Sequence, residues 1–506
     1  NNYNYNYLYF NSIHALQGKQ MGIVVRQSFL NLISIGIAFL IGAVNTLYLY
    51  PTFLGSKLQG LIIALLAISN LLQPFISFGT QHAVIRYYSK YTKKTDKDGL
   101  LTLSIIIPLV IVILFAPIFY AYYDEIRQFL FQNDQSLSQY AYVILFVAVS
   151  TSFFEVFYSW LRVKLKSVFG NFLKELYPRL LISFLLISYS YGVLDFENFV
   201  LFLIYGYYLR LLIIIIYSFY INKPRISLSF KSDFKEVFKY CLLIFLSGAA
   251  SSIILDIDKS MLSSILTVEN VAYYSVAVFI AAVIEIPGRA MFQILSPVVA
   301  DAINKKHFKK LEGLLKKSST NLVLVASLFF LLINLNLDDF YEMLNQDGYS
   351  IGIPIVIIVS FGKLYSMSIG CINNIISNSK YYYYTFWFSL FSSVLAVVLN
   401  IYLITDYGIV GAAYATLIVI IIMNSLKLYL IKVKFNIQPY SKDTVKIIVL
   451  SIIGFVIFSN LKLDFQPVLN IIIKSSLILI LYTLSAYIFR LSDDVNIFID
   501  KFNKNW

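Results

Sequence analysis

Residues 60–79 read GLIIALLAISNLLQPFISFG, an apolar run that contains no charged residue. A helical run of this length crosses the hydrocarbon core of a bilayer, which is about 30 Å thick and requires about 20 residues. Similar runs recur from one end of the chain to the other, and 59% of the residues are hydrophobic while only 13% are charged. This composition excludes an ordinary water-soluble globular protein. The sequence therefore predicts an all-α integral membrane protein.

The apolar runs predict about fourteen transmembrane helices of the length that a bilayer requires. They begin after residues 1–20, an Asn/Tyr-rich segment that we interpret as a disordered extension. The predicted spans are 29–50, 60–82, 100–121, 140–160, 179–194, 198–219, 240–258, 271–293, 319–337, 351–371, 383–404, 409–431, 445–460 and 468–489.

Basic residues are concentrated in alternate loops, on one side of the predicted membrane. Because cytoplasmic loops retain Lys and Arg, this pattern predicts that both termini are cytoplasmic. It also accounts for the net charge of +13 without a nucleic-acid partner. The opposite loops hold only Lys57, Arg127, Lys259 and Lys462.

An internal repeat appears when the chain is shifted by 213 residues, which superposes Pro74 on Pro287 within two predicted helices. Because the shift contains an even number of spans, the two halves have the same orientation in the membrane. The alternative is a coincidence of membrane composition. The shift also pairs Asn45 with Asp258 and Lys93 with Lys306.

The repeat predicts two parallel six-helix lobes followed by two additional C-terminal helices. The predicted domains are the extension 1–20, an N-terminal lobe 21–225, a C-terminal lobe 226–434, and the two last helices with a cytoplasmic tail, 435–506.

Four basic residues fall in or near the predicted spans, namely Arg210, Arg289, Lys363 and Lys474. Lys474 lies outside the repeat, and we interpret it as extending toward the membrane interface, which leaves Arg210, Arg289 and Lys363 as candidates. Since a charge in the bilayer is costly, such residues usually face a cavity or a partner. A cavity lined by them suits an anionic substrate such as a diphosphate. The alternatives are helix packing against backbone carbonyls for Arg210 and Lys363, and a structural ion pair with Glu285 for Arg289.

The acidic residues that can serve ion coupling are Glu155, Asp256 and Glu285, although Asp256 is also explained by a position at the membrane interface. Pro74 and Pro287 are hinge candidates because a proline within a helix frees a backbone carbonyl; static kinks are the alternative. No metal-binding or nucleotide-binding motif is present in the sequence, so no metal and no cofactor are predicted.

Three segments carry a resemblance to a known family: residues 60–79, residues 258–301, and residues 400–416, which read NIYLITDYGIVGAAYAT. They resemble the polysaccharide biosynthesis protein family, whose Wzx-type oligosaccharide (O-antigen) flippases belong to the multidrug/oligosaccharidyl-lipid/polysaccharide exporter superfamily. In the third segment Thr405-Asp-Tyr replaces the usual proline-containing turn.

The resemblance implies a transporter, not an enzyme, that moves polyprenyl-diphosphate-linked oligosaccharide across the bacterial inner membrane by alternating access. Its implied partners are this lipid-linked oligosaccharide, membrane lipids and polysaccharide assembly enzymes. The alternatives are a drug or cation antiporter of the same superfamily and a membrane polysaccharide polymerase or glycosyltransferase. The outer loops are short for the last class, and cationic cavity candidates disfavour a cation antiporter.

Replacing Arg210 or Lys363 by alanine is expected to cripple transport while leaving membrane insertion intact, because each removes a cation from the predicted cavity. Export of surface polysaccharide and the amount of protein in the membrane fraction are the measurements. Unchanged export would contradict the predicted role of that residue in the cavity.

Overall fold

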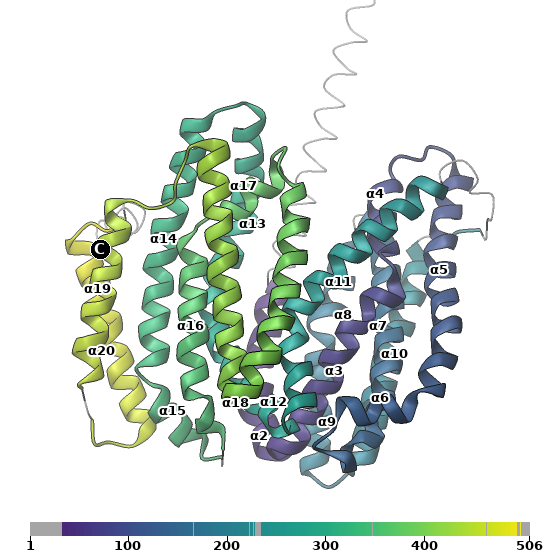
Figure 1. Cartoon of the computed structure of the whole chain (residues 1–506), viewed down its shortest axis with the longest axis horizontal. Coiled ribbons are helices and arrows are strands. Elements are labelled where there is room, and N and C mark those ends of the chain that lie inside the picture. The colour runs from purple at the N-terminus through teal and green to yellow at the C-terminus, as the bar shows by residue number, and fades with distance from the viewer. Residues whose placement is uncertain are drawn as a thin grey trace, which may run out of the picture. The chain divides into compact units, whose positions relative to one another are not determined.

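The computed structural model describes residues 33–164, 166–221, 223–225, 227, 234–346, 348–461, 463–492 and 496. The expected extension 1–20, the start of the first span and the end of the C-terminal tail lie outside this part. The described chain is helical and contains no strand (Figure 1). The prediction of an all-α membrane protein is confirmed.

Ten helices of the described chain are long and apolar enough to cross a membrane, or eleven when the bent helix α11 is included. The other predicted spans also coincide with helices. Spans 383–404 and 409–431 correspond to the two arms of α18, two helices that meet at a sharp break at Gly408. Spans 179–194 and 445–460 correspond to α9, with 14 residues, and α19, with 18 residues.

Gly408 makes the break in α18 by adopting φ 60° and ψ −140°. Residues with a side chain rarely adopt this conformation, so a glycine is required where the chain turns between the two arms of α18. The two arms are residues 383–407 and 409–435.

The chain forms two compact units. The first comprises residues up to Phe53, Ile68–Arg127 and Gln139–Ala249, and the second comprises Leu54–Ala67, Gln128–Ser138 and the chain from Ala250 onward. Helix α3 is continuous across one of these boundaries, and the last boundary falls at the 45° bend of α11. The sequence places the lobe boundary between residues 225 and 226 instead.

The first unit is built from α7 and α10 with the shorter helices around them, and its core contains Phe154, Trp160 and Leu211. Its helices, including those shared with the second unit, are Ile33–Phe53 with η1 (Asn45–Leu49) and α2 (Tyr50–Phe53), α3 (Gly55–Ser77), α4 (Thr80–Tyr87), α5 (Lys94–Ala121), α6 (Tyr123–Leu130), η2 (Gln135–Ala141), α7 (Tyr142–Val163), α8 (Ser167–Glu175), α9 (Tyr177–Ser190), α10 (Phe196–Ile221) and α11 (Phe234–Ile265).

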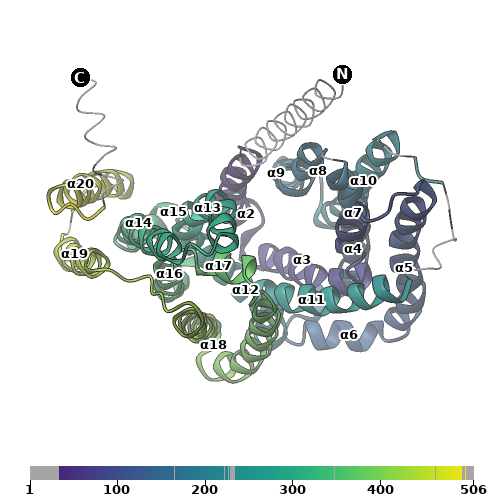
Figure 2. The same cartoon turned by 90° about the horizontal axis from the view of Figure 1, so that it is seen from above.

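The second unit packs α16 against α12, α14 and α18. Figure 2 shows α19 and α20 on the side of α14 away from α18. Its remaining helices are α12 (Val268–Ala282), η3 (Val283–Glu285), α13 (Ile286–Asn304), α14 (Phe308–Asn334), α15 (Leu337–Leu344), η4 (Tyr349–Gly352), α16 (Ile353–Ser368), α17 (Ile372–Asn378), α18 (Tyr383–Phe435), α19 (Lys442–Ser459) and α20 (Pro467–Ile488).

The last helix, α20, is attached to α15 by a mostly buried ion pair. Lys474 of α20 lies 2.6 Å from a carboxylate oxygen of Asp339 in α15, and Asn470 donates a hydrogen bond to the other oxygen. Since an unpaired charge within the membrane is costly, this pair fixes the position of α20.

The two hinge candidates lie next to different interruptions of their helices. Pro74 lies inside α3, which ends at Ser77 before Phe78 and Gly79 adopt left-handed conformations. Pro287 lies in the first turn of α13, directly after the short 3₁₀ helix η3. A proline is tolerated in a first turn because the backbone N–H groups there have no partner within the helix.

The start of α3 and the start of α12 meet at one end of the second unit. The charge pattern of the sequence predicts that this end lies outside. Gly60 touches the backbone carbonyl of Val268, and an added Cβ would overlap that oxygen. The Asp134 carboxylate accepts a 2.8 Å hydrogen bond from the Val268 N–H, which is otherwise unpaired at the helix start.

Two tyrosines add further contacts at this end. Tyr349 donates a 2.5 Å hydrogen bond to the amide oxygen of Gln59, and both residues are buried. Tyr273 donates to Ser56 at 3.3 Å. We call these contacts of Ser56, Gln59, Gly60, Asp134, Val268, Tyr273 and Tyr349 the outer interlock.

The Gly60→Ala substitution is expected to destabilise the outer interlock by about 1–3 kcal/mol, because the new methyl group forces α3 away from Val268. The measurement is the midpoint of thermal unfolding of the purified protein in detergent. Gly248→Ala is the matched control, since Gly248 is also helical and has open space at its Cβ position. A midpoint of Gly60→Ala at or above that of the wild type would contradict the close contact.

Candidate functional site

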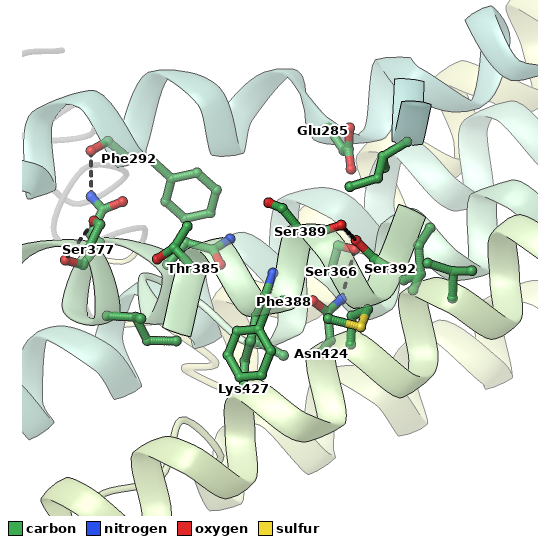
Figure 3. Close-up of a pocket in the computed structure, with 18 of the residues that line it drawn as sticks. Glu285, Phe292, Ser366, Ser377, Thr385, Phe388, Ser389, Ser392, Asn424 and Lys427 are labelled. Atoms are coloured by element: carbon green, nitrogen blue, oxygen red, sulfur yellow. Dashed lines mark hydrogen bonds between the residues drawn. The ribbon is translucent and has the colours of Figure 1, made fainter. Parts of the chain in front are cut away.

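A polar cavity of about 540 Å³ lies within the second unit. It is bounded by α13, the end of α16, α17 and both arms of α18. Figure 3 shows Glu285 and Phe292 on one side of the cavity, and Lys427 and Asn424 of α18 on the other. The cavity thus depends on the break at Gly408, which lets two distant segments of one helix face the same space.

Two cations of the cavity have no acidic partner in the described part of the chain. Arg289 projects from α13 and is exposed, and Lys427 projects from the second arm of α18. Glu285, the acidic residue among the lining side chains, forms an ion pair of 3.1 Å with Lys363 of α16. Since this pair is neutral, the cavity has a positive surplus from Arg289 and Lys427.

The position of Glu285 explains why it pairs with Lys363 and not with Arg289. The residues are four apart, which in a regular helix places them on one face. However, Glu285 ends the 3₁₀ helix η3, and Arg289 belongs to the α-helix that follows. The change of helical type breaks the regular spacing on which the predicted pairing rested.

Hydrogen bonds between lining residues hold the cavity wall together. Asn374 of α17 donates to the backbone carbonyl of Phe292 at 2.7 Å, and Asn424 of α18 donates to the hydroxyl of Ser366 in α16 at 3.0 Å. These amides link four helices through buried or half-buried polar contacts. They fix the positions of the helices that present the two cations.

Arg210 belongs to the first unit and is not among the residues that line the polar cavity of the second unit. It is only 4% exposed, and its guanidinium lies 4.4 Å from the ring centre of Phe154 and 4.7 Å from that of Tyr207. One guanidinium N–H donates to Thr151 at 3.2 Å. Cation–π contacts thus hold Arg210 among helices, so the Arg210→Ala experiment also needs a measurement of stability.

The three acidic candidates each have a lysine partner. Glu155 lies 2.7 Å from Lys174 of α8, Asp256 lies 2.8 Å from Lys259, and Glu285 pairs with Lys363. Burial opposes protonation of Lys174, but the neighbouring Glu155 outweighs this effect and raises the pKa of Lys174. The pairing reduces the cost of placing these carboxylates near or within the membrane.

Asp258 forms a hydrogen-bond network that the sequence did not single out as a site. Its carboxylate accepts hydrogen bonds from Tyr274 at 2.6 Å, from Asn400 at 2.6 Å and from Thr416 at 2.7 Å. The donors come from α12 and from both arms of α18, so this carboxylate joins three segments of the second unit.

The available signal for Asp258 was the internal repeat, which pairs this residue with Asn45. In the first unit the Asn45 side chain donates to the backbone carbonyl of Arg179 at 2.8 Å and accepts from Ser183 at 2.6 Å. Both polar residues therefore connect the first helix of their half with the fifth. In the described residues, no group of His, Cys, Asp and Glu side chains forms a metal-binding cluster.

Lys427 was also missed as a site residue, because it was counted with the basic residues of the following cytoplasmic loop although it lies within the predicted span 409–431. In the structure α18 extends to Phe435, and Lys427 lies two turns before this end and lines the cavity.

Solved structures of membrane transporters have the same fold. A structure described as lipid II flippase MurJ in an inward-closed conformation matches 91% of this chain and 99% of its own, with a TM-score of 0.71 and 18% identity. An inward-facing multidrug resistance MATE family transporter of the MOP superfamily matches 81% of this chain and 94% of its own, with a TM-score of 0.59 and 16% identity.

A third structure is described as a MOP superfamily transporter from Pyrococcus furiosus with reversed polarity of its binding pocket. It matches 86% of this chain and 94% of its own, with a TM-score of 0.51 and 14% identity. These likenesses define the class: a multi-pass helical membrane protein with the fold of MOP superfamily transporters.

The sequence profile of the polysaccharide biosynthesis protein family matches residues 24–302. The chain belongs to this family, as the resemblance predicted. The comparison with curated protein sequences finds no match.

The Glu285–Lys363 pair is expected to show a coupling energy of about 0.5–3 kcal/mol, because each single neutral substitution leaves the other charge unpaired in a half-buried site. The measurement is a double-mutant cycle of unfolding free energy with Glu285→Gln, Lys363→Gln and the double variant. Strictly additive effects of the two substitutions would contradict an energetic role for this ion pair.

Proposed function

We propose that this protein is a transporter that translocates polyprenyl-diphosphate-linked oligosaccharide across the bacterial inner membrane for surface polysaccharide assembly. The observation that carries the proposal is the polar cavity with its two unneutralised cations, Arg289 and Lys427. A diphosphate is the anionic part of such a lipid, and Arg and Lys both bind phosphate oxygens through charge-assisted hydrogen bonds.

Membership in the polysaccharide biosynthesis protein family supports the oligosaccharide part of this proposal. The fold likeness to a lipid II flippase supports the class of lipid-linked substrates. In this proposal the protein has two parallel repeats, both termini are cytoplasmic, and the cavity is exposed alternately to either side, with Pro74 and Pro287 as bending points. The lipids of the membrane and polysaccharide assembly enzymes are its partners.

A cation antiporter of the same superfamily is the second candidate, because a MATE transporter shares the fold. A cation-binding cavity needs acidic side chains that are free to bind the substrate. Glu285, the acidic residue lining the polar cavity, is neutralised by Lys363, while Arg289 and Lys427 repel cations. The charge of the cavity therefore favours the anionic substrate. For ion coupling, the carboxylate of Glu155, Asp256 or Glu285 would first have to separate from its paired lysine.

The proposal is tested with purified protein in liposomes that contain a fluorescent polyprenyl-diphosphate oligosaccharide. We expect protein-dependent translocation of this lipid, and we expect Arg289→Gln and Lys427→Gln each to slow it by about tenfold or more. The reason is that a hydrogen bond to a charged group contributes about 1.5–3 kcal/mol, and about 1.4 kcal/mol is a factor of ten.

Lys309→Gln is the control, because this exposed lysine lies in α14 outside the cavity and its loss should leave the rate unchanged. If the labelled lipid stays in its leaflet while a cationic dye moves against a gradient, the antiporter replaces the flippase. Full activity of both cavity variants would show that the anionic group binds elsewhere.

A further inference from the structure

The polar groups around the cavity divide into those that hold the wall together and those that face the cavity without a protein partner. The amides of Asn374 and Asn424 are engaged with Phe292 and Ser366, and the hydroxyl of Ser392 donates to the backbone carbonyl of Ser389. These groups are occupied by contacts between helices.

A second set lines the same cavity, and its side chains make no hydrogen bond to the described residues. It consists of Asn373 in α17, and Thr385 and Ser389 on the first arm of α18. Asn373 and Thr385 are exposed and Ser389 is half-buried. Thr385 and Ser389 are four residues apart and thus lie on one face of their helix, toward the cavity (Figure 3).

The chemistry of this second set differs from that of the two cations. Arg289 and Lys427 only donate hydrogen bonds, which suits phosphate oxygens. An amide and a hydroxyl each donate and accept. A bare diphosphate offers only acceptors, so it cannot donate to the amide oxygen of Asn373, whereas a sugar supplies hydroxyl groups that both donate and accept.

Two aromatic rings complete the wall. Phe292 of α13 and Phe388 of α18 line the cavity and are half-buried. Flat apolar rings beside amide and hydroxyl groups suit the apolar C–H faces and polar edge of a sugar ring. In this membrane-spanning unit, such a mixed wall contrasts with the apolar cavity formed by α14, α16, α18 and α19, whose lining is almost entirely hydrocarbon.

The size of the cavity limits what it can hold. Ligand sites for small molecules measure about 300–1,000 Å³. The observed volume of about 540 Å³ accommodates a diphosphate and an adjoining sugar, but not a long oligosaccharide or a polyprenyl chain.

From these observations we infer that Asn373, Thr385 and Ser389 form a saccharide subsite for the sugar bonded directly to the diphosphate, beside the cations Arg289 and Lys427. This inference rests on the proposed function, since it assigns one part of the same substrate to one part of the cavity wall. The protein then recognises the junction of lipid and glycan, and sugars farther from the diphosphate lie outside the cavity.

The test measures the affinity of the purified full-length protein for a short-chain polyprenyl diphosphate, either bare or carrying one glucose, galactose or N-acetylglucosamine. The readout is the ratio of the two dissociation constants, bare over glycosylated. We expect wild-type protein to bind at least one glycosylated form more tightly. The triple variant Asn373→Ala, Thr385→Val, Ser389→Ala should reduce this ratio by about tenfold, because it removes the hydrogen bonds to the sugar.

Two controls separate recognition from folding. Thr385→Ser keeps the hydroxyl and should keep most of the ratio, and Ser459→Ala in α19 removes a serine hydroxyl outside the cavity and should leave both affinities unchanged. The thermal midpoint of each variant shows whether it folds; if the triple variant does not fold, the three single substitutions are measured instead.

The outcomes separate a failure of the saccharide subsite from a failure of the proposed function. If wild-type protein binds bare and glycosylated diphosphates equally, or if the substitutions leave the ratio unchanged, the saccharide subsite is wrong and the flippase proposal remains. If the wild type binds neither ligand, the proposed function itself fails. The subsite would be established if the triple variant loses the preference for the glycosylated diphosphate and Thr385→Ser retains it.

Discussion

The cost of a charge in a low-dielectric membrane is the constraint on which the other features of this structure depend. Four acidic side chains in or near the helices are each paired with a lysine from a neighbouring turn or another helix, as Glu155–Lys174, Asp256–Lys259, Glu285–Lys363 and Asp339–Lys474, while Asp258 is held by hydroxyl and amide donors. Because these acids already have partners, a cation without an acidic partner must be stabilised in another way, and that way indicates its role. Arg210 is stabilised by aromatic rings, whereas Arg289 and Lys427 face a cavity. The pattern of pairing therefore separates structural from candidate functional charges.

The sequence predicted the membrane class and the positions of the helices, because hydrophobic length is imposed by the bilayer independently of tertiary contacts. The two spans predicted on either side of residue 408 correspond to the two arms of α18. The sequence could not predict that both arms line one cavity, because hydropathy locates a span without showing what its side chains face. Lys427 lies within the predicted span 409–431, and its place in the cavity follows only from the packing of α18.

The candidate site was predicted in part. Arg289 and Glu285 line one cavity of the second unit, and Lys363 is paired with Glu285 without lining it. The partner of Glu285 depends on a local change from 3₁₀ to α-helix that residue spacing does not reveal. Asn373, Thr385 and Ser389 carried no signal in the sequence, because uncharged polar residues are common in membrane helices. Their importance follows from which neighbouring amides and hydroxyls are already engaged, and only a three-dimensional structure supplies that information.

Helix α3 has a consequence for how such a molecule can move. Its first residues belong to the second unit, where Gly60 touches Val268, while the part from Ile68 onward belongs to the first unit. Helix α11 is also shared between the units, but it is bent by 45° where the boundary falls, between Phe234–Ala250 and Ser252–Ile265. A change of shape in either unit therefore acts directly on α3, whose uninterrupted run of helix has to bend or twist to follow it, whereas α11 already has a bend at the boundary.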